Sequence, residues 1–280
     1  MKPPFAYYGG KTTIAERIVA LMPEHRHYVE PFAGSLAVLL AKAPALFETV
    51  NDLDGHLMTF WRVLRDRPED LSRVCALTPH SRQEHHLAYD LDTEDDLERA
   101  RRVWVCLTQG RGNTLRKTGW RHFQDPGRRG PTSMPDYLEA YTQRMRHAAG
   151  RIANVSLECR SGLEVIADYG RHDEVLIYAD PPYLGSTRSS RQYLVEMSHV
   201  DEHRALAEAL NACKATVVLS GYHSPLYDEL YDGWHRVEFA TYTGQGNHAE
   251  DRNDRRVEVI WSNRPVARPN LFDTQEGTAS

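Results

Sequence analysis

One stretch in the second half of the chain limits what the chain can fold into. An apolar run, residues 175–179, ends abruptly at Asp180-Pro181-Pro182-Tyr183. The run predicts a short buried strand of a parallel sheet, and Pro181 must end it because proline has no N–H to donate to a neighbouring strand. Asp180 therefore lies at the carboxyl end of a strand, which is the edge where open α/β sheets bind their ligands.

Two strand–turn–helix patterns nearer the amino terminus predict a nucleoside pocket. The first strand ends at Glu30, which can accept hydrogen bonds from a ligand ammonium or hydroxyl, and Gly34 in the following turn allows close backbone approach. The second, residues 47–52, ends in Asp52, from where a carboxylate can hold ribose hydroxyls. An Asn-Asp turn or the cap of the next helix is the alternative role of Asp52. The dinucleotide fingerprint GxGxxG is absent.

The amino-terminal segment carries Gly9-Gly10-Lys11 ahead of a helix that the apolar spacing predicts over residues 14–22. A phosphate loop needs a glycine five positions before Gly10, where this chain has Phe5, so we exclude a nucleoside triphosphate site. Lys11 and backbone amides can instead bind another anionic or polar ligand, such as a carboxylate. A plain turn with a solvated lysine is the alternative.

From Gly55 to about Ala153 the pattern changes to helices, predicted at 57–64, 68–77, 97–107 and 135–149. This predicts an inserted helical subdomain, whose residues 109–123 form the most basic loop of the chain. Its cations can neutralise phosphates, while Asn113, Trp120 and Phe123 can read or wedge bases. A solvated loop is the alternative. The candidate DNA-binding residues are Arg111, Asn113, Arg116, Lys117 and Arg121, with Arg188 and Arg191 from the polar loop after Tyr183.

The strand and helix alternation resumes after the insertion. We expect a strand at 155–159, a helix at 163–169, a helix at 199–213 and a strand at 215–222, followed by an edge hairpin of 235–239 and 257–261. Residues 265–280 lack periodicity and are expected to form a flexible tail.

Composition narrows the class of protein. A net charge of −5 argues against a uniformly basic nucleic-acid coat but leaves room for a local basic cleft. The four cysteines are scattered without a CxxC pair, and no HExxH occurs, so we expect no metal site. There is no apolar run long enough to cross a bilayer and no signal segment, which leads us to expect a cytoplasmic protein.

Together these motifs resemble one family, the adenine-N6 DNA methyltransferases of the alpha arrangement, known as the DNA adenine methylase or D12 class. The resemblance covers most of the chain and includes the order of the motifs. It rests on an aromatic-Gly-Gly-Lys element, a Pro-Phe-x-Gly element, an acid after the second strand, a helical insertion, Asp-Pro-Pro-Tyr, a Ser-Gly-Tyr turn at 220–222 and the late strand beginning Arg256-Val257-Glu258.

The resemblance implies S-adenosylmethionine as methyl donor and an α/β, Rossmann-like core with a mixed seven-stranded sheet whose last strand is antiparallel. It implies a catalytic core of residues 1–54 and 154–264 around a target-recognition insertion, 55–153. Ser161 falls near the adenine ring of the donor, at a position where the family often has an acid. The implied cofactor-binding residues are Tyr7, Lys11, Glu30, Pro31, Phe32, Gly34, Asp52, Ser161 and Asp180.

The chemistry of the tetrad Asp180, Pro181, Pro182 and Tyr183 supports the same interpretation. An adenine N6 amine is a poor nucleophile because its lone pair is delocalised into the ring. The Asp180 carboxylate and the Pro181 carbonyl can accept its two hydrogens and stabilise the charge that develops on nitrogen. Tyr183 would stack on a base flipped out of the duplex. No metal and no covalent enzyme intermediate is required.

Two other functions compete with site-specific adenine methylation of double-stranded DNA. An N4-cytosine methyltransferase faces the same amine problem and often has serine in place of Asp180. A non-catalytic DNA-binding module with a methyltransferase-like fold is the second alternative. We expect a monomer or weak dimer without membrane contact. The recognition sequence and a restriction endonuclease partner stay open.

Overall fold

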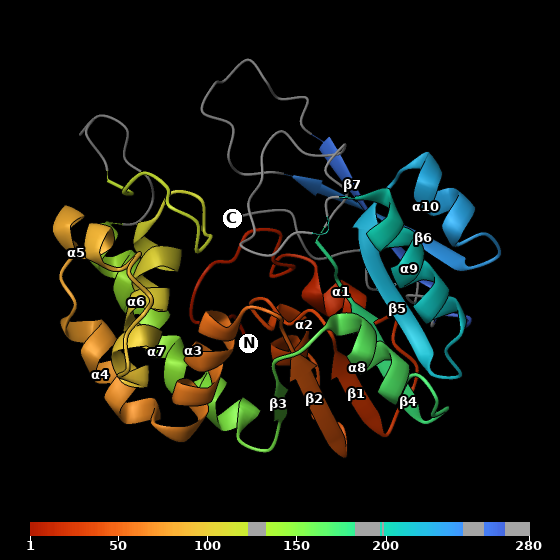
Figure 1. Cartoon of the computed structure of the whole chain (residues 1–280), viewed down its shortest axis with the longest axis horizontal. Coiled ribbons are helices and arrows are strands. Elements are labelled where there is room, and N and C mark those ends of the chain that lie inside the picture. The colour runs from red at the N-terminus through yellow and green to blue at the C-terminus, as the bar shows by residue number, and fades with distance from the viewer. Residues whose placement is uncertain (123–132, 183–196, 198, 243–254, 267–280) are drawn as a thin grey trace, which may run out of the picture.

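The computed structural model describes residues 1–122, 133–182, 197, 199–242 and 255–266 (Figure 1). Phe123, Tyr183, Arg188, Arg191 and the expected tail from 267 onward lie outside the described residues. None of the helices that the structure describes combines the length and the apolar character needed to cross a membrane.

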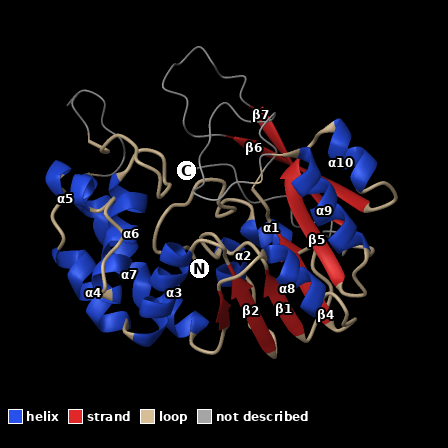
Figure 2. Ribbon diagram, viewed as in Figure 1, coloured by secondary structure: helices blue, strands red, loops and turns tan. Residues whose placement is uncertain are grey.

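A seven-stranded sheet in the order β3-β2-β1-β4-β5-β7-β6 forms the centre of the molecule (Figure 2). All neighbouring pairs are parallel except those of β7, which is antiparallel to both β5 and β6. The expected edge hairpin and the antiparallel last strand are therefore confirmed. The strands are β1 (His27–Glu30), β2 (Phe47–Asn51), β3 (Ser156–Glu158), β4 (Val175–Ala179), β5 (Thr216–Tyr222), β6 (His235–Tyr242) and β7 (Arg255–Ser262).

Alternate side chains of the central strands pack into cores on opposite faces of the sheet. Leu176 and Tyr178 of β4 join one core, and Ile177 and Ala179 join the other, as the period of two in a strand requires. One face is covered by α1 (Ala15–Val19) and α2 (Ala37–Ala41). The other is covered by α8 (Gly162–Tyr169), α9 (Val200–Asn211) and α10 (Pro225–Leu230).

Five helices gather beyond β3, at the left of Figure 1. Four of them match the helices that the sequence predicts. The hydrophobic core of these helices is continuous with that of one sheet face, since Trp104 and Phe60 belong to the same cluster as Tyr28. These helices and the sheet therefore share one hydrophobic core. The helices are α3 (Gly55–Asp66), α4 (Pro68–Leu77), α5 (Arg82–Leu87), α6 (Asp96–Gln109) and α7 (Met134–Ile152).

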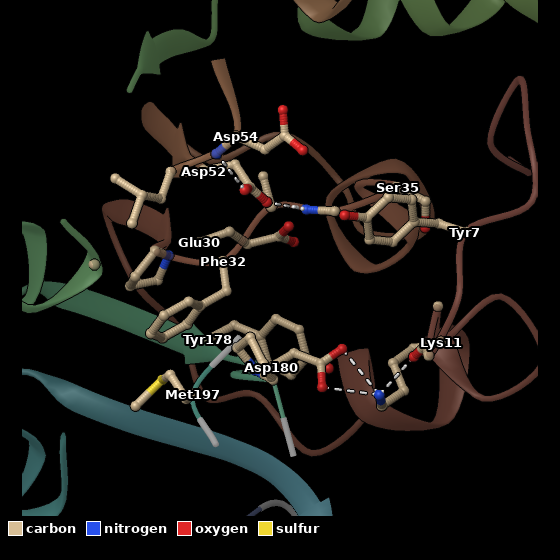
Figure 3. Close-up of a pocket in the computed structure, with 18 of the residues that line it drawn as sticks. Tyr7, Lys11, Glu30, Phe32, Ser35, Asp52, Asp54, Tyr178, Asp180 and Met197 are labelled. Carbon is tan, nitrogen blue, oxygen red and sulfur yellow. Dashed lines mark hydrogen bonds and ion pairs between the residues drawn. The ribbon is translucent and has the colours of Figure 1, made fainter. Parts of the chain in front are cut away.

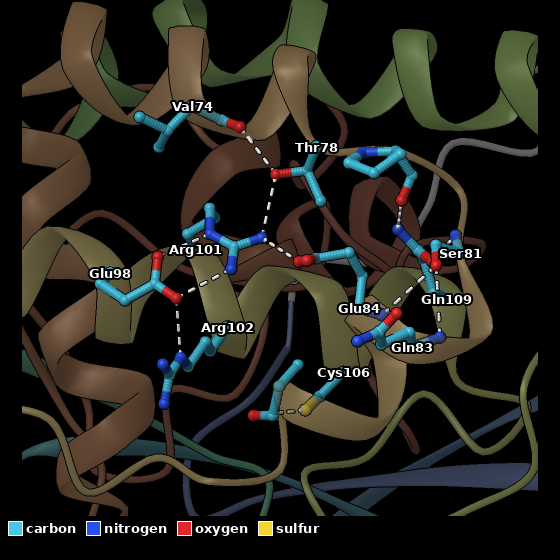
Figure 4. A network of polar contacts seen from close by, with 12 residues as sticks. Val74, Thr78, Ser81, Gln83, Glu84, Glu98, Arg101, Arg102, Cys106 and Gln109 are labelled. Carbon is cyan, nitrogen blue, oxygen red and sulfur yellow. Dashed lines mark hydrogen bonds and ion pairs between the residues drawn. The ribbon is translucent and has the colours of Figure 1, made fainter.

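Polar contacts fix these helices to one another (Figure 4). The Arg101 guanidinium on α6 donates to Glu98 on its own helix, to Glu84 on α5 and to Thr78 after α4, at 2.7, 2.8 and 3.1 Å. One arginine therefore ties three helical segments together. The short helix α5 was not predicted, because six residues are too few to show a helical period.

A buried charge cluster joins the last of these helices to the sheet. The Glu48 carboxylate on β2 accepts from Lys42 Nζ at 2.7 Å and from Arg151 Nη2 of α7 at 2.8 Å. All three side chains are almost fully buried. Burial alone would raise the pKa of Glu48, but the hydrogen bonds from Arg151 and Lys42 outweigh it and hold that pKa below its ordinary value. We call Lys42, Glu48 and Arg151 the joint cluster.

Candidate active site

A pocket of about 470 Å³ opens at the carboxyl ends of β1, β2 and β4 (Figure 3). The structure brings all the expected cofactor-binding residues together here, although they come from segments more than 150 residues apart. They are Tyr7, Lys11, Glu30, Pro31, Phe32, Gly34, Asp52, Ser161 and Asp180, joined by Pro182. Residues that the sequence analysis did not single out also line it: Asp54, Leu163, Met197, Asp201 and Glu202 among them.

Asp180 directly follows β4 and is held by Lys11. Lys11 Nζ lies 2.8 Å from Asp180 Oδ1 and 2.9 Å from Oδ2, and it also donates to the Gly9 carbonyl at 2.8 Å. The lysine is buried, whereas the Asp180 side chain keeps 19% of its surface exposed. The sequence predicts a ligand for Lys11, whereas in the structure its ammonium pairs with a carboxylate of the protein itself, that of Asp180.

A second carboxylate approaches the same ammonium. Glu258 Oε1 on β7 lies 3.5 Å from Lys11 Nζ and accepts a hydrogen bond of 2.7 Å from the Ser220 hydroxyl on β5. Sequence reasoning used both segments only as family landmarks. A buried acid that interrupts the apolar strand Val257–Trp261 was the available signal. We call Lys11, Asp180 and Glu258 the catalytic cluster, after the role that we propose for Asp180.

Glu30 ends β1 and is buried. Its Oε1 accepts from the Tyr28 hydroxyl at 2.5 Å and from the Leu39 backbone N–H at 2.8 Å. Leu39 lies in the first turn of α2, so the acid supplies an acceptor to a helix N–H that has no partner within the helix. Burial raises the pKa of Glu30 to about 8, and the two hydrogen bonds offset only part of that rise.

Asp52 follows β2 and binds the turn that follows β1. Its Oδ2 accepts from Gly34 N and its Oδ1 from Asp54 N, each at 3.0 Å. Burial raises the pKa of Asp52 to about 6. The turn role of Asp52 is confirmed, but its role as a helix cap is wrong. Asp54 caps α3 instead, accepting from His56 N and Leu57 N, because it directly precedes the helix.

Two glycines make room for the rings that line the pocket. Gly34 has a φ of +48°, in the region that favours glycine, and a Cβ there would lie 3.2 Å from the Tyr7 ring. A Cβ on Gly162 would lie only 2.7 Å from the Phe32 ring. Neighbouring Ser161 is the N-cap of α8, yet its side chain makes no capping hydrogen bond within that helix. Its hydroxyl is not committed to the cap.

Residues 7–243 match the family model described as "D12 class N6 adenine-specific DNA methyltransferase". The chain belongs to this family. It is an adenine-specific DNA methyltransferase, and family membership implies S-adenosylmethionine as its methyl donor and DNA as its substrate. The mixed seven-stranded sheet is accordingly a Rossmann-like methyltransferase core.

Curated relatives agree with this assignment. The type II methyltransferase M1.LlaDCHI of Lactococcus lactis subsp. cremoris is 28% identical, over 87% of this chain and 90% of its own. The DNA N-6-adenine-methyltransferase of Escherichia phage P1 is 27% identical over 84% of this chain, which spans about a third (32%) of that protein. A solved rRNA methyltransferase, aviRa of Streptomyces viridochromogenes, aligns over 94% of this chain and 88% of its own with 12% identity. Its TM-score of 0.39 is too low to support any conclusion.

The basic loop of the methyltransferase is attached to the amino-terminal segment of the pocket. The Asn113 carbonyl accepts from Tyr8 N at 2.9 Å, and Gly110 pairs with Trp120 to close the loop. The Arg121 guanidinium donates to Asn113 Oδ1, to the Gly110 carbonyl and to the Tyr137 hydroxyl. These contacts shape the loop from within, and they leave Lys117 and Arg111 exposed on its surface.

The ring of Trp120 is held within the loop. His80 stacks on it at 4.4 Å and His122 at 4.9 Å between ring centroids, and the Arg82 guanidinium lies 4.8 Å from its centroid. This packing makes Trp120 a support for the loop in the structure. The described residues contain no group of three or more His, Cys, Asp or Glu side chains arranged to hold a metal ion.

Proposed function

We propose that the pocket is the S-adenosylmethionine site and that Asp180 and the Pro181 carbonyl accept the hydrogens of the adenine N6 amine. The observation that carries the proposal is the position of Asp180. Its carboxylate lies at the pocket, at the end of β4, and is oriented by a buried lysine from the other end of the chain.

The pocket suits an amphipathic, cationic nucleoside. Its volume of about 470 Å³ lies in the range of small-molecule sites, about 300–1,000 Å³. Carboxylates at the ends of β1 and β2 provide acceptors, while Phe32, Leu53 and Leu163 provide apolar surface. When bound, S-adenosylmethionine supplies an electrophilic methyl group.

Different side chains of the pocket would bind different parts of S-adenosylmethionine. Glu30 would accept from the ammonium of the methionine part and Asp52 from the ribose hydroxyls, because both carboxylates line the pocket. Phe32 would lie against an adenine ring, and the Ser161 hydroxyl would accept or donate at its edge. The uncommitted hydroxyl of Ser161 supports this role in place of the family's acid.

Asp180 acts on the target amine. Accepting an N–H bond makes the amine nitrogen more tetrahedral and stabilises the positive charge that develops as nitrogen attacks. The Pro181 carbonyl would accept the second hydrogen, and Pro182 would stiffen the segment. Tyr183, outside the described residues, would stack on a base flipped from double-stranded DNA.

The helical part, residues 55–153, would carry the DNA-binding loop. Arg111, Arg116 and Lys117 would contact phosphates, as would Arg188 and Arg191, which lie outside the described residues. Asn113 and Arg121 would act chiefly by fixing the loop, as their contacts within it support. We also propose that the protein is a monomer or weak dimer and that it methylates adenine within a specific DNA sequence.

Binding of S-adenosylmethionine to Asp52→Asn protein tests the pocket assignment. We expect the Kd, measured by titration calorimetry, to rise about tenfold or more, since a hydrogen bond to a charged group is lost. Asp95→Asn is the matched control, because it removes the same charge at a helix N-cap outside the pocket lining and asparagine still caps α6. Equal losses in the two variants would contradict a direct ribose contact.

The methylated product tests the reaction. The protein is incubated with radiolabelled S-adenosylmethionine and duplex DNA, and part of the DNA is digested to identify the labelled nucleoside. The rest is sequenced by a method that detects methylated bases, which gives the context of each methylated adenine. We expect N6-methyladenine at one recurring sequence context. Label spread over adenines of every context would contradict the proposed sequence-specific loop.

A further inference from the structure

Two side chains behind the catalytic acid come from neighbouring antiparallel strands. In the pairing of β5 with β7, Ser220 lies opposite Ile260 and Tyr222 lies opposite Glu258. Because side chains two apart on a strand share a face, Ser220 and Glu258 lie on the same side of the sheet. The Ser220 hydroxyl donates to Glu258 Oε1 at 2.7 Å, and both residues are buried.

The Lys11 ammonium lies between two acids. Its distances are 2.8 and 2.9 Å to the two oxygens of Asp180 and 3.5 Å to Glu258 Oε1. An ammonium has three protons, and Asp180 receives contact through both of its oxygens. The lysine is thus held closely by Asp180 and attracted more weakly by Glu258.

This geometry creates a conflict for the reaction. Asp180 must offer an oxygen lone pair to the target amine while a buried ammonium competes for both of its oxygens. A second carboxylate, 3.5 Å from the same ammonium, weakens that competition, because unlike charges attract strongly where water is excluded. We propose that Glu258, fixed by Ser220, is a positioning residue that shares Lys11 with Asp180 and so keeps the Asp180 carboxylate available to the amine.

The inference rests on the proposed role of Asp180, and it goes beyond that role by giving the late strand β7 a part in the reaction. A purely structural Glu258 has different consequences. It would affect the free energy of unfolding and the fraction of active protein, but not the rate constant of each active site. A positioning Glu258 changes the rate constant and leaves substrate affinities unchanged, because the residue touches neither substrate.

Glu258→Gln separates these cases, because glutamine keeps the shape and still accepts from Ser220. We expect the single-turnover rate constant at saturating DNA and S-adenosylmethionine to fall about tenfold or more, by analogy with residues that orient the ligands of metal sites. The Kd values for both substrates stay unchanged. Rates are divided by the active-site concentration from a burst titration, so a loss of folded protein does not count.

Glu48→Gln is the matched control, a buried acid paired with Lys42 and Arg151 away from the pocket. It should lower the free energy of unfolding and leave the rate constant of each active site unchanged. A second test is Ser220→Ala alone and together with Glu258→Gln. If Ser220 acts through Glu258, the alanine lowers the rate in the wild-type background and has no further effect in the double variant.

Three results decide the inference. A wild-type rate constant in Glu258→Gln, with Asp180→Asn inactive, would overturn the role of Glu258 and leave that of Asp180 intact. Fully additive effects of Ser220→Ala and Glu258→Gln would overturn the link between those two residues. Full activity of Asp180→Asn would instead remove the proposed function on which the inference rests.

Discussion

The joint cluster and the catalytic cluster are both largely buried groups of charges that include a lysine, yet they have opposite composition. The joint cluster has two cations around one carboxylate, Glu48, whose oxygens are fully used within the protein. The catalytic cluster has one cation, Lys11, between two carboxylates, one of which lies at the pocket. Where cations outnumber acids, the carboxylate is held in place by hydrogen bonds within the protein. Where acids outnumber cations, one carboxylate can still accept a hydrogen bond from a ligand.

The largest effect is expected from Asp180→Asn, which removes the acceptor charge from the catalytic cluster. Methyl transfer should slow by about a thousandfold, the scale seen when a charge-stabilising group is removed from a reaction centre. The single-turnover rate constant is the measurement. Because Glu258 still provides a countercharge for Lys11, thermal unfolding should change less than in Glu48→Gln. An active variant would show that this cluster is as purely structural as the other.

Glu48→Gln is expected to lower the free energy of unfolding and to leave the rate constant of methyl transfer unchanged. Removing the single acid leaves Lys42 and Arg151 buried without a countercharge, which costs about 3–5 kcal/mol of stability. Denaturant unfolding measures this loss. The pKa of Glu48 is held below its ordinary value, so its contribution is present above the unfolded pKa and is lost as pH falls through the folded one. Stability of the wild type should therefore decline in acid more steeply than that of the variant.

Glu30 interacts electrostatically with both clusters, through Asp180 and Lys42. Its protonation state gives a further test of how the two clusters differ. With a pKa of about 8 it is largely neutral at pH 7, and a bound ammonium favours its ionised form. Affinity for S-adenosylmethionine should therefore rise with pH below about 8, by up to tenfold per unit when one proton is released. Calorimetry in buffers of different ionisation enthalpy counts that proton.

Glu30→Gln provides the control for this pH dependence. The variant should keep only the titration of the ligand's own amine, with no proton released from the protein. Equal proton release by the two proteins would show that Glu30 does not face the ammonium.

The smallest effect is expected from Lys117→Ala on the exposed loop. Its charge is screened by salt, unlike those of the buried clusters, so DNA affinity should fall a few-fold and the slope of log affinity against log salt should drop by about 1. Affinity for S-adenosylmethionine should not change. Arg171→Ala, an exposed cation before β4, serves as the control, and an equal change in its salt slope would remove the loop's assigned role.

Local patterns sufficed to predict most elements. Residues close in sequence were enough to locate β4, its end at Pro181, and the acids that end β1 and β2. Short helices such as α10 escaped, because six residues show no clear period. The partner of Lys11 was not predicted either, since Asp180 lies 169 residues away and only the tertiary fold brings the two together.

The same reasoning explains what sequence patterns reveal of the site. Asp52 could be located because it ends a strand, but its hydrogen bond to Gly34 depends on how two turns meet. Glu258 and Ser220 face each other only through the pairing of β5 with β7. Residue type and periodicity thus indicate where ligand-binding groups lie along the edge of the sheet. Strand pairing decides which of those groups touch.

The place of β7 in the sheet has a consequence for biosynthesis. This strand lies between β5 and β6 although it is made after both. Glu258 is therefore the last residue of the catalytic cluster to leave the ribosome, while Lys11 is the first. A nascent chain that ends before β7 can bring Lys11 to Asp180 but lacks the strand that separates β5 from β6. The complete sheet, and with it the full set of Lys11, Asp180 and Glu258, can therefore form only after residue 262 has been synthesised.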